Sequence, residues 1–144
     1  MKGRRLAFIG YLFLMIRLII FKYPYNYMLS IMENWNKNVI FEGIENANFT
    51  FFKTIKMYID YAYMLNSFDN LVGNVAIFIP FGFFLPMVFS NAKKLWVSLL
   101  NAFLMTFAIE GFQLLTGLGV FDVDDILLNM IGAFTGYAIY KVLV

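Results

Sequence analysis

The sequence predicts an all-α, polytopic membrane protein: a bundle of four transmembrane helices with an interfacial helix on its outer face. Apolar residues make up 62% of the chain, aromatic residues 20%, and the mean hydropathy is +0.74. Such a composition is typical of an integral membrane protein. A bilayer core of ~30 Å takes about twenty residues of helix to cross. We therefore expect a single membrane domain over residues 1–144, with transmembrane helices near 6–21, 71–89, 95–116 and 125–144.

The charges predict which ends of these helices face the cytoplasm. With the N-terminus inside, the inner side carries basic residues and no acid, as the positive-inside tendency requires. All nine acidic residues then fall on the outer side or in the outer part of a helix. The N-terminal segment reads as an uncleaved signal anchor, and both termini are expected in the cytoplasm. The inner basic residues are Lys2, Arg4, Arg5, Lys93, Lys94 and Lys141.

The first predicted helix, 6–21, is short and contains Arg17 about one turn from its outer end. An unpaired cation at the bilayer centre costs roughly 2.5 to 3.5 kcal/mol on insertion scales, and less near the interface. Two interpretations follow. Arg17 extends to the outer headgroups, or it pairs with Glu110, which lies at a similar depth.

Residues 22–70 form a long outer segment with no run long enough to span a membrane. Tyr23, Tyr25 and Tyr27 are expected to anchor the end of the first helix at the interface. Further along, apolar residues recur at helical spacing, which predicts a helix lying in the membrane surface over the bundle. This helix could simply cover helix ends or could contact a substrate. Its apolar residues are Phe51, Phe52, Ile55, Ile59, Ala62 and Tyr63.

The second predicted helix, 71–89, presents amides on one face and contains helix breakers. Asn70, Asn74 and Phe78 follow at intervals of four, so both amides point to one neighbour. Pro80 removes a hydrogen bond within the helix, and a kink is expected there. The link at residues 91–94 is so short that it predicts an antiparallel hairpin into the third helix.

The third predicted helix, 95–116, carries the most deeply placed acid. Glu110 is fifteen residues from Leu95, or about 22 Å along the helix, which leaves it one to two turns below the outer surface. Gln113 shares its face.

A turn containing three aspartates then leads into the fourth predicted helix, 125–144. Asp122 or Asp124 is a natural N-cap for that helix, but capping cannot account for all three aspartates. Asn129 lies four residues after Asp125, on the same stripe as Gly132 and Gly136. The spacing of the two glycines predicts close contact with another helix.

These motifs, in this order, resemble the VanZ-like family of bacterial membrane proteins from about residue 50 to the C-terminus. The most specific parts are N-x3-F-x-P-F-G at 74–82, E-x2-Q at 110–113 and F-D-V-D-D-x3-N-x2-G at 121–132. Many members of the family carry an arginine shortly before the F-D motif, where this chain has Gly119 and Val120. If that arginine holds an anionic group, this chain lacks it or replaces it with Arg17.

The resemblance implies a bacterial inner-membrane protein linked to resistance against teicoplanin, a lipoglycopeptide antibiotic, or to envelope lipid metabolism. It implies no particular reaction. The net charge of +2 is accounted for by topology, and the sequence shows no sign of nucleotide or nucleic-acid binding. Because the chain has no Cys or His, thiolate and imidazole metal ligands and Ser-His or Cys nucleophile systems are excluded.

Depth and topology predict that acids and amides from three helices converge in the outer third of the bundle. A carboxylate inside a membrane indicates a functional site, because its burial is costly unless it is paired, hydrogen-bonded or protonated. The predicted site comprises Asn74, Glu110, Gln113, Asp122, Asp124, Asp125 and Asn129, with Arg17 as a further candidate.

Three functions would fit this site. It could bind the polar head of an amphiphile, a membrane lipid or lipoglycopeptide, whose chain lies among the aromatic helices. It could belong to an enzyme acting on a lipid-linked headgroup, with Glu110, Asp122 and Asp125 holding a divalent cation, although no residue is an obvious nucleophile. Finally, the polar groups could be structural and hold the bundle together.

Overall fold

The computed structural model describes residues 2–61 and 67–144, and within those ranges the chain forms helices with no strand. One isolated parallel bridge joins Asn48 to Asp122. The all-α prediction is therefore confirmed. The elements are α1 (Lys2–Ile19), α2 (Tyr25–Glu33), α3 (Lys37–Asn46), α4 (Lys53–Asp60), α5 (Ser67–Val88), the 3₁₀ turn η1 (Ser90–Lys93), α6 (Leu95–Thr116) and α7 (Val123–Leu143).

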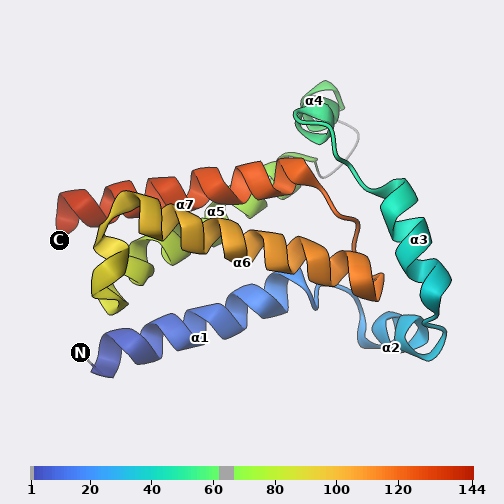
Figure 1. The fold of residues 1–144 in the computed structure, drawn as a ribbon, viewed down its shortest axis with the longest axis horizontal. Coiled ribbons are helices and arrows are strands. Elements are labelled where there is room, and N and C mark those ends of the chain that lie inside the picture. The colour runs from blue at the N-terminus through green and yellow to red at the C-terminus, as the bar shows by residue number, and fades with distance from the viewer. Residues whose placement is uncertain (1, 62–66) are drawn as a thin grey trace.

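The long helices α1, α5, α6 and α7 run lengthwise beside one another (Figure 1). Both chain termini and η1 lie at one end of this bundle, whereas α2, α3 and α4 lie at the opposite end. The predicted hairpin is present, because η1 connects α5 directly to α6. The six basic residues assigned to the inner side thus belong to helix ends and a turn at one end of the molecule.

Three of the described helices are long and apolar enough to cross a membrane: α5 over Asn70–Val88, α6 over Leu95–Thr116 and α7 over Val123–Leu143. The predicted limits of α6 are matched residue for residue. Helix α1 is not among the three, because its 18 residues include four basic ones, Lys2, Arg4, Arg5 and Arg17. It also begins earlier than the predicted 6–21, because the helix continues through the basic N-terminal residues.

Glycines allow α5 and α7 to pack backbone against backbone. A Cβ atom added to Gly132 would lie 2.1 Å from the carbonyl oxygen of Val75, and one on Gly136 would lie 1.9 Å from that of Ile79. On the facing helix, a Cβ on Gly82 would lie 1.9 Å from the carbonyl oxygen of Ala133. The predicted close contact is therefore formed, and it takes small residues from both helices.

The hydrophobic core lies between α1, α5 and their neighbours. Phe78 and Met15 are fully buried, and Phe8 packs its ring against Phe81 with centroids 6.0 Å apart. Helix α5 continues through Pro80 and Pro86 without a break in its helical assignment. The apolar residues of α5 thus form the centre against which α1 and α7 pack.

The outer segment contains more regular structure than the sequence predicted. Helices α2 and α3 were not foreseen, whereas α4 falls within the stretch predicted to be helical. Trp35 donates a 2.9 Å hydrogen bond to the carbonyl of Leu115, which ties the α2–α3 connection to the end of α6. Phe51 and Phe52 are exposed beside α4. Ala62 and Tyr63, which were part of the predicted helix, lie outside the described residues.

Candidate functional site

A cavity of about 140 Å³ lies where α1 and α6 end and where α5 and α7 begin. We call it the polar cavity, because most of its lining side chains carry nitrogen or oxygen. Its apolar lining comes from α1 and α5, and its acids come from α6 and α7. The lining residues are Leu18, Ile19, Lys22, Asn70, Gly73, Asn74, Ile77, Glu110, Gln113, Asp125 and Asn129.

Glu110 and Gln113 enter the cavity from one face of α6, as their spacing predicted. Only 2% of Glu110 and 4% of Gln113 is exposed. The backbone N–H of Asp122 donates to Oε2 of Glu110 at 2.9 Å. The amide of Gln113 donates to the carbonyl of Ile19 at 3.4 Å, close to the upper limit for a hydrogen bond. The buried carboxylate of α6 is thus hydrogen-bonded to the N-cap residue of α7.

Asn74 and Asp125 meet across the cavity from α5 and α7. The side-chain amide of Asn74 donates to Oδ1 of Asp125 at 2.6 Å. Asn70, one turn earlier on α5, lines the same cavity, so the prediction that both amides share a face is confirmed. A carboxylate that accepts from an amide in this way is held in one orientation.

Asn129 is the most deeply buried amide of the site, with 2% exposed. Its Nδ2 donates to the hydroxyl of Thr106 at 2.8 Å. Its Oδ1 is buried and accepts no hydrogen bond from any group in residues 2–61 and 67–144. A buried acceptor without a partner costs about 1–3 kcal/mol, so this atom is an exception among the polar groups of the site.

Asp122 does not face the cavity. Its side chain caps α7 by accepting from the backbone N–H of Asp124 at 2.8 Å, which confirms one of the two predicted N-caps. The same carboxylate accepts from Nδ2 of Asn48 at 2.8 Å and from the hydroxyl of Thr54 at 2.5 Å. These contacts turn Asp122 toward the outer segment.

Asp124 is fully buried and caps a different helix, α4. Its carboxylate accepts from the backbone N–H of Phe52 at 2.6 Å, of Thr54 at 2.8 Å and of Ile55 at 3.2 Å. Phe52 has φ 66°, a left-handed conformation that is unusual for a bulky residue. The carboxylate therefore satisfies the free amides at the start of α4 and helps to hold a strained residue in place.

The structure thus brings some of the predicted site residues into one cavity and directs the side chains of others elsewhere. Asn74, Glu110, Gln113, Asp125 and Asn129 line one cavity. Asp122 and Asp124 do not, because backbone amides and polar side chains of the outer segment and of the α7 cap take up their oxygens.

Arg17 does not line the cavity either. It is exposed on α1, and its guanidinium donates to the carbonyl of Phe21. The alternative of a pair with Glu110 is not formed. The cation that lines the cavity is Lys22.

Sequence reasoning missed Lys22, Asn48, Thr54 and Thr106. Lys22 directly follows the predicted helix 6–21, and this position at its outer end is a signal that could have indicated it. Thr106 is one turn before Glu110 on α6, a spacing that would have placed it near the same face. The contacts of Asn48 and Thr54 join residues about 70 positions apart, and no local pattern indicates them.

Tyr58 of α4 lies near Asp122 and Asp125. Burial raises the pKa of its hydroxyl, and the negative charges of Asp125 and Asp122 raise it further, while a hydrogen bond with Asn70 lowers it. The side chain therefore remains a neutral phenol at physiological pH. Through Asn70 it connects α4 to the start of α5.

The carboxylates are not arranged as the metal-dependent interpretation required. Within residues 2–61 and 67–144 there is no group of three acids placed to hold one metal ion. The predicted set of Glu110, Asp122 and Asp125 is divided, because Asp122 is directed to Asn48 and Thr54. A three-carboxylate centre built from these residues is therefore not formed.

Comparison with known proteins agrees with the motifs. The family described as VanZ/LLP1 matches residues 8–144. Protein VanZ of Enterococcus faecium is 28% identical over 132 residues, which is 90% of this chain and 68% of that protein. No solved structure matches the chain. The family match covers nearly the whole sequence, including every helix that lines the polar cavity, and the chain therefore belongs to the VanZ/LLP1 family.

Proposed function

We propose that this protein spans the bacterial cytoplasmic membrane and binds the polar head of an amphiphile in the polar cavity, from the outer leaflet. In the proposed topology α1 is the fourth membrane helix. Its 18 residues extend about 27 Å, and the basic residues at its start would lie in the inner headgroup region while the apolar remainder crosses the core. Leu6, Phe13 and Leu14 are exposed on α1, as expected for a helix that faces lipid.

The proposed orientation places both termini in the cytoplasm. The end of the bundle with the termini and η1 carries basic residues only, which favours the cytoplasmic side. The polar cavity then opens near the outer leaflet, and α2, α3 and α4 lie on the outer face.

The unpartnered Oδ1 of Asn129 carries the proposal that the cavity takes a ligand. A structural network normally satisfies every buried acceptor, and the carboxylates of Glu110, Asp124 and Asp125 each accept a hydrogen bond. Asn129 lacks a donor on that atom but lines a cavity. A ligand with a hydroxyl or amine group would supply it.

The size and lining of the cavity favour a small polar head. About 140 Å³ would hold a fragment such as an amino alcohol or a glycerol unit, but not a glycopeptide. Lys22 could meet an anionic group, and Glu110 and Asp125 could meet a cationic or hydroxylated one. Resistance would therefore come from handling an envelope lipid and not from enclosing the antibiotic.

An apolar path beside the cavity suits the chain of such an amphiphile. Leu18 lines the cavity and is also 50% exposed on α1. The wall of the cavity therefore reaches the surface that α1 would present to lipid. A headgroup inside and an acyl chain along α1 would satisfy both environments.

The test is the teicoplanin susceptibility of a sensitive bacterial host that expresses the chain, with Asp125→Asn and Asn129→Asp as cavity variants. An exposed acid on α3, Glu45→Gln, is the matched control. All proteins are compared at equal membrane abundance. The proposal expects protection by the wild type and the control, and its loss in both cavity variants.

A structural role for the polar groups is the second candidate. Asp122 and Asp124 favour it, because their hydrogen bonds go to caps and to the outer segment. If the cavity variants protect the host against teicoplanin as well as the wild type does, the polar cavity is structural and the binding proposal is wrong.

A further inference from the structure

A second polar surface lies at the opposite end of the bundle. Two adjoining hollows of about 450 and 240 Å³ share Arg5, Val88 and Ser90 in their linings. We call them together the basic groove. Its charged and polar residues come from α1 and η1, and they are Arg4, Arg5, Ser90, Asn91 and Lys93, with Asn101 from α6.

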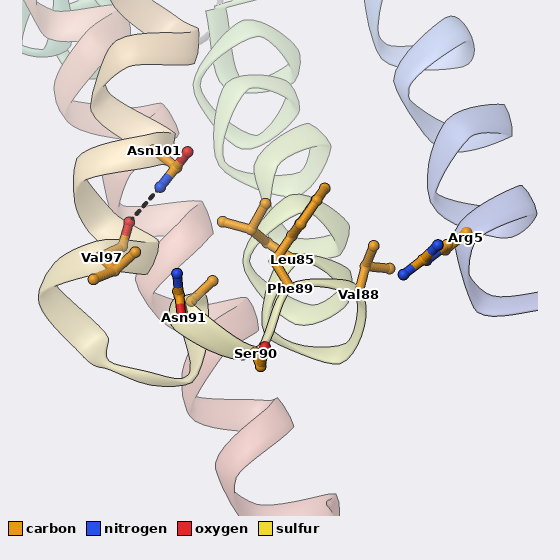
Figure 2. Close-up of a pocket in the computed structure, with 9 residues that line it drawn as sticks. Arg5, Leu85, Val88, Phe89, Ser90, Asn91, Val97 and Asn101 are labelled. Carbon is orange, nitrogen blue, oxygen red and sulfur yellow. Dashed lines mark hydrogen bonds between the residues drawn. The ribbon is translucent and has the colours of Figure 1, made fainter. Parts of the chain in front are cut away.

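The basic groove combines cations with an apolar wall. Arg5 extends from α1 toward Val88 at the end of α5, and Ser90 and Asn91 lie below Leu85 and Phe89 (Figure 2). No acid lines either hollow. Charges of one sign beside an apolar surface match an anionic head joined to a hydrocarbon chain.

The turn that carries Lys93 is fixed in position. The backbone carbonyl of Lys93 accepts a 2.6 Å hydrogen bond from the hydroxyl of Tyr137 on α7. Ala92, the preceding residue, is only 1% exposed. Because η1 is anchored on both counts, the backbone that carries Ser90 and Lys93 is held in place before any ligand arrives. A preorganised site loses less conformational entropy on binding.

The position of the groove favours a lipid over a soluble anion as its ligand. Val88 ends α5 and Leu95 begins α6, so the groove lies where two membrane-spanning helices leave the bilayer. Phe89 is 53% exposed beside it. An anion that binds here would reach the site from the headgroup region of the leaflet, with its acyl chain against Leu85 and Phe89.

We propose that the basic groove binds the phosphate of an anionic phospholipid of the inner leaflet, with Arg5 and Lys93 as the principal cations. This site is separate from the polar cavity and needs no ligand there, but its place in the inner leaflet rests on the membrane orientation of the proposed function. If the basic residues served only to orient the chain in the membrane, removing two of them from the groove or two from elsewhere at the same end would have the same effect on lipid binding. A specific site predicts that only the residues of the groove matter.

The full chain is reconstituted into nanodiscs of phosphatidylcholine with a minor fraction of phosphatidylglycerol, and the phosphatidylglycerol retained after extraction is measured by native mass spectrometry. Arg5→Gln/Lys93→Gln is compared with Lys2→Gln/Lys141→Gln, which removes two charges from the same end but none from the groove. At about fivefold per basic residue near a membrane, the first variant is expected to bind roughly 25-fold more weakly. The control should bind as the wild type does.

Two further arms complete the test. Arg5→Lys retains the charge and should keep most of the binding, even if Arg5→Gln/Lys93→Gln fails to fold. Equal losses in both double variants, or no preference for phosphatidylglycerol over phosphatidylcholine in the wild type, would overturn the proposal. Displacement of the lipid by millimolar glycerol phosphate would also overturn it, since the site would then serve a soluble phosphate.

Discussion

The backbone N–H of Asp122, the N-cap residue of α7, donates a 2.9 Å hydrogen bond to the carboxylate of Glu110, so an acid buried in α6 is connected to the start of α7. The side chain of Asp122 in turn accepts from the amide of Asn48 and from the N–H of Asp124. One residue thus connects the polar cavity to the helix cap and to the outer segment. Substitutions at Glu110 that keep the hydrogen bond to Asp122 are therefore expected to spare the stability of the protein, even where they alter binding in the polar cavity.

Replacing Glu110 with Gln should preserve the fold, because the side-chain carbonyl oxygen can still accept from Asp122. Replacing it with Ala leaves that N–H buried without an acceptor, which costs about 1–3 kcal/mol. The measurement is the thermal stability of the protein in detergent. Glu110→Ala should unfold at a clearly lower temperature than Glu110→Gln. Equal stability of the two variants would show that this hydrogen bond does not hold the start of α7.

Replacing Asp124 with Asn should loosen α4 while leaving the long helices intact. Its carboxylate accepts from three backbone amides at the start of α4, and hydrogen bonds to a charged group contribute roughly 1.5–3 kcal/mol each. An asparagine offers one acceptor oxygen where two are used. Hydrogen exchange of the amides of Phe52, Thr54 and Ile55 should therefore accelerate by at least about tenfold.

The control for this experiment is Glu33→Gln, an exposed acid at the end of α2. It should leave exchange in α4 unchanged. Faster exchange throughout α5 and α7 in the Asp124 variant would contradict a local role, because it would mean that the cap stabilises the whole bundle.

The membrane helices could be predicted from the sequence because their signal is local. Long apolar runs with defined ends give α5, α6 and α7, and the limits of α6 are exact. The spacing of Glu110 and Gln113 on one helix, and of Asn70 and Asn74 on another, predicted that each pair shares a face, and all four residues line one cavity. Helical periodicity predicts the shared faces, whereas the meeting of the two helices follows from their depth and topology.

The roles of the three aspartates could not be divided in the same way. Asp122, Asp124 and Asp125 lie within four residues, yet only Asp125 reaches the cavity. The carboxylate of Asp124 accepts hydrogen bonds from backbone amides at the start of α4, about 70 residues away in the sequence. The structure of the outer segment decides this, and α2 and α3 have helix lengths of 9 and 10 residues with no apolar run to indicate them.

Adding one methyl group at Gly136 should disrupt the contact between α5 and α7. The new Cβ would lie 1.9 Å from the carbonyl oxygen of Ile79, which is backbone and cannot move aside. Overpacking of this kind costs about 1–3 kcal/mol. Gly136→Ala should lower the unfolding temperature in detergent. The matched control is Gly111→Ala on α6, where no atom lies within 4 Å of the added Cβ. Similar destabilisation by both would contradict a specific α5–α7 contact.

Removing the polar pair of Asn129 and Thr106 should separate stability from function. In Thr106→Val/Asn129→Leu neither buried polar partner remains, and replacing both partners with apolar groups of similar shape is nearly neutral or stabilising. The double variant should therefore unfold at or above the wild-type temperature. Thr106→Val alone leaves Nδ2 of Asn129 without its acceptor and should be less stable by about 1–3 kcal/mol. If the cavity binds a headgroup through Oδ1 of Asn129, the stable double variant gives no teicoplanin protection. Full protection by that variant would remove Asn129 from the site.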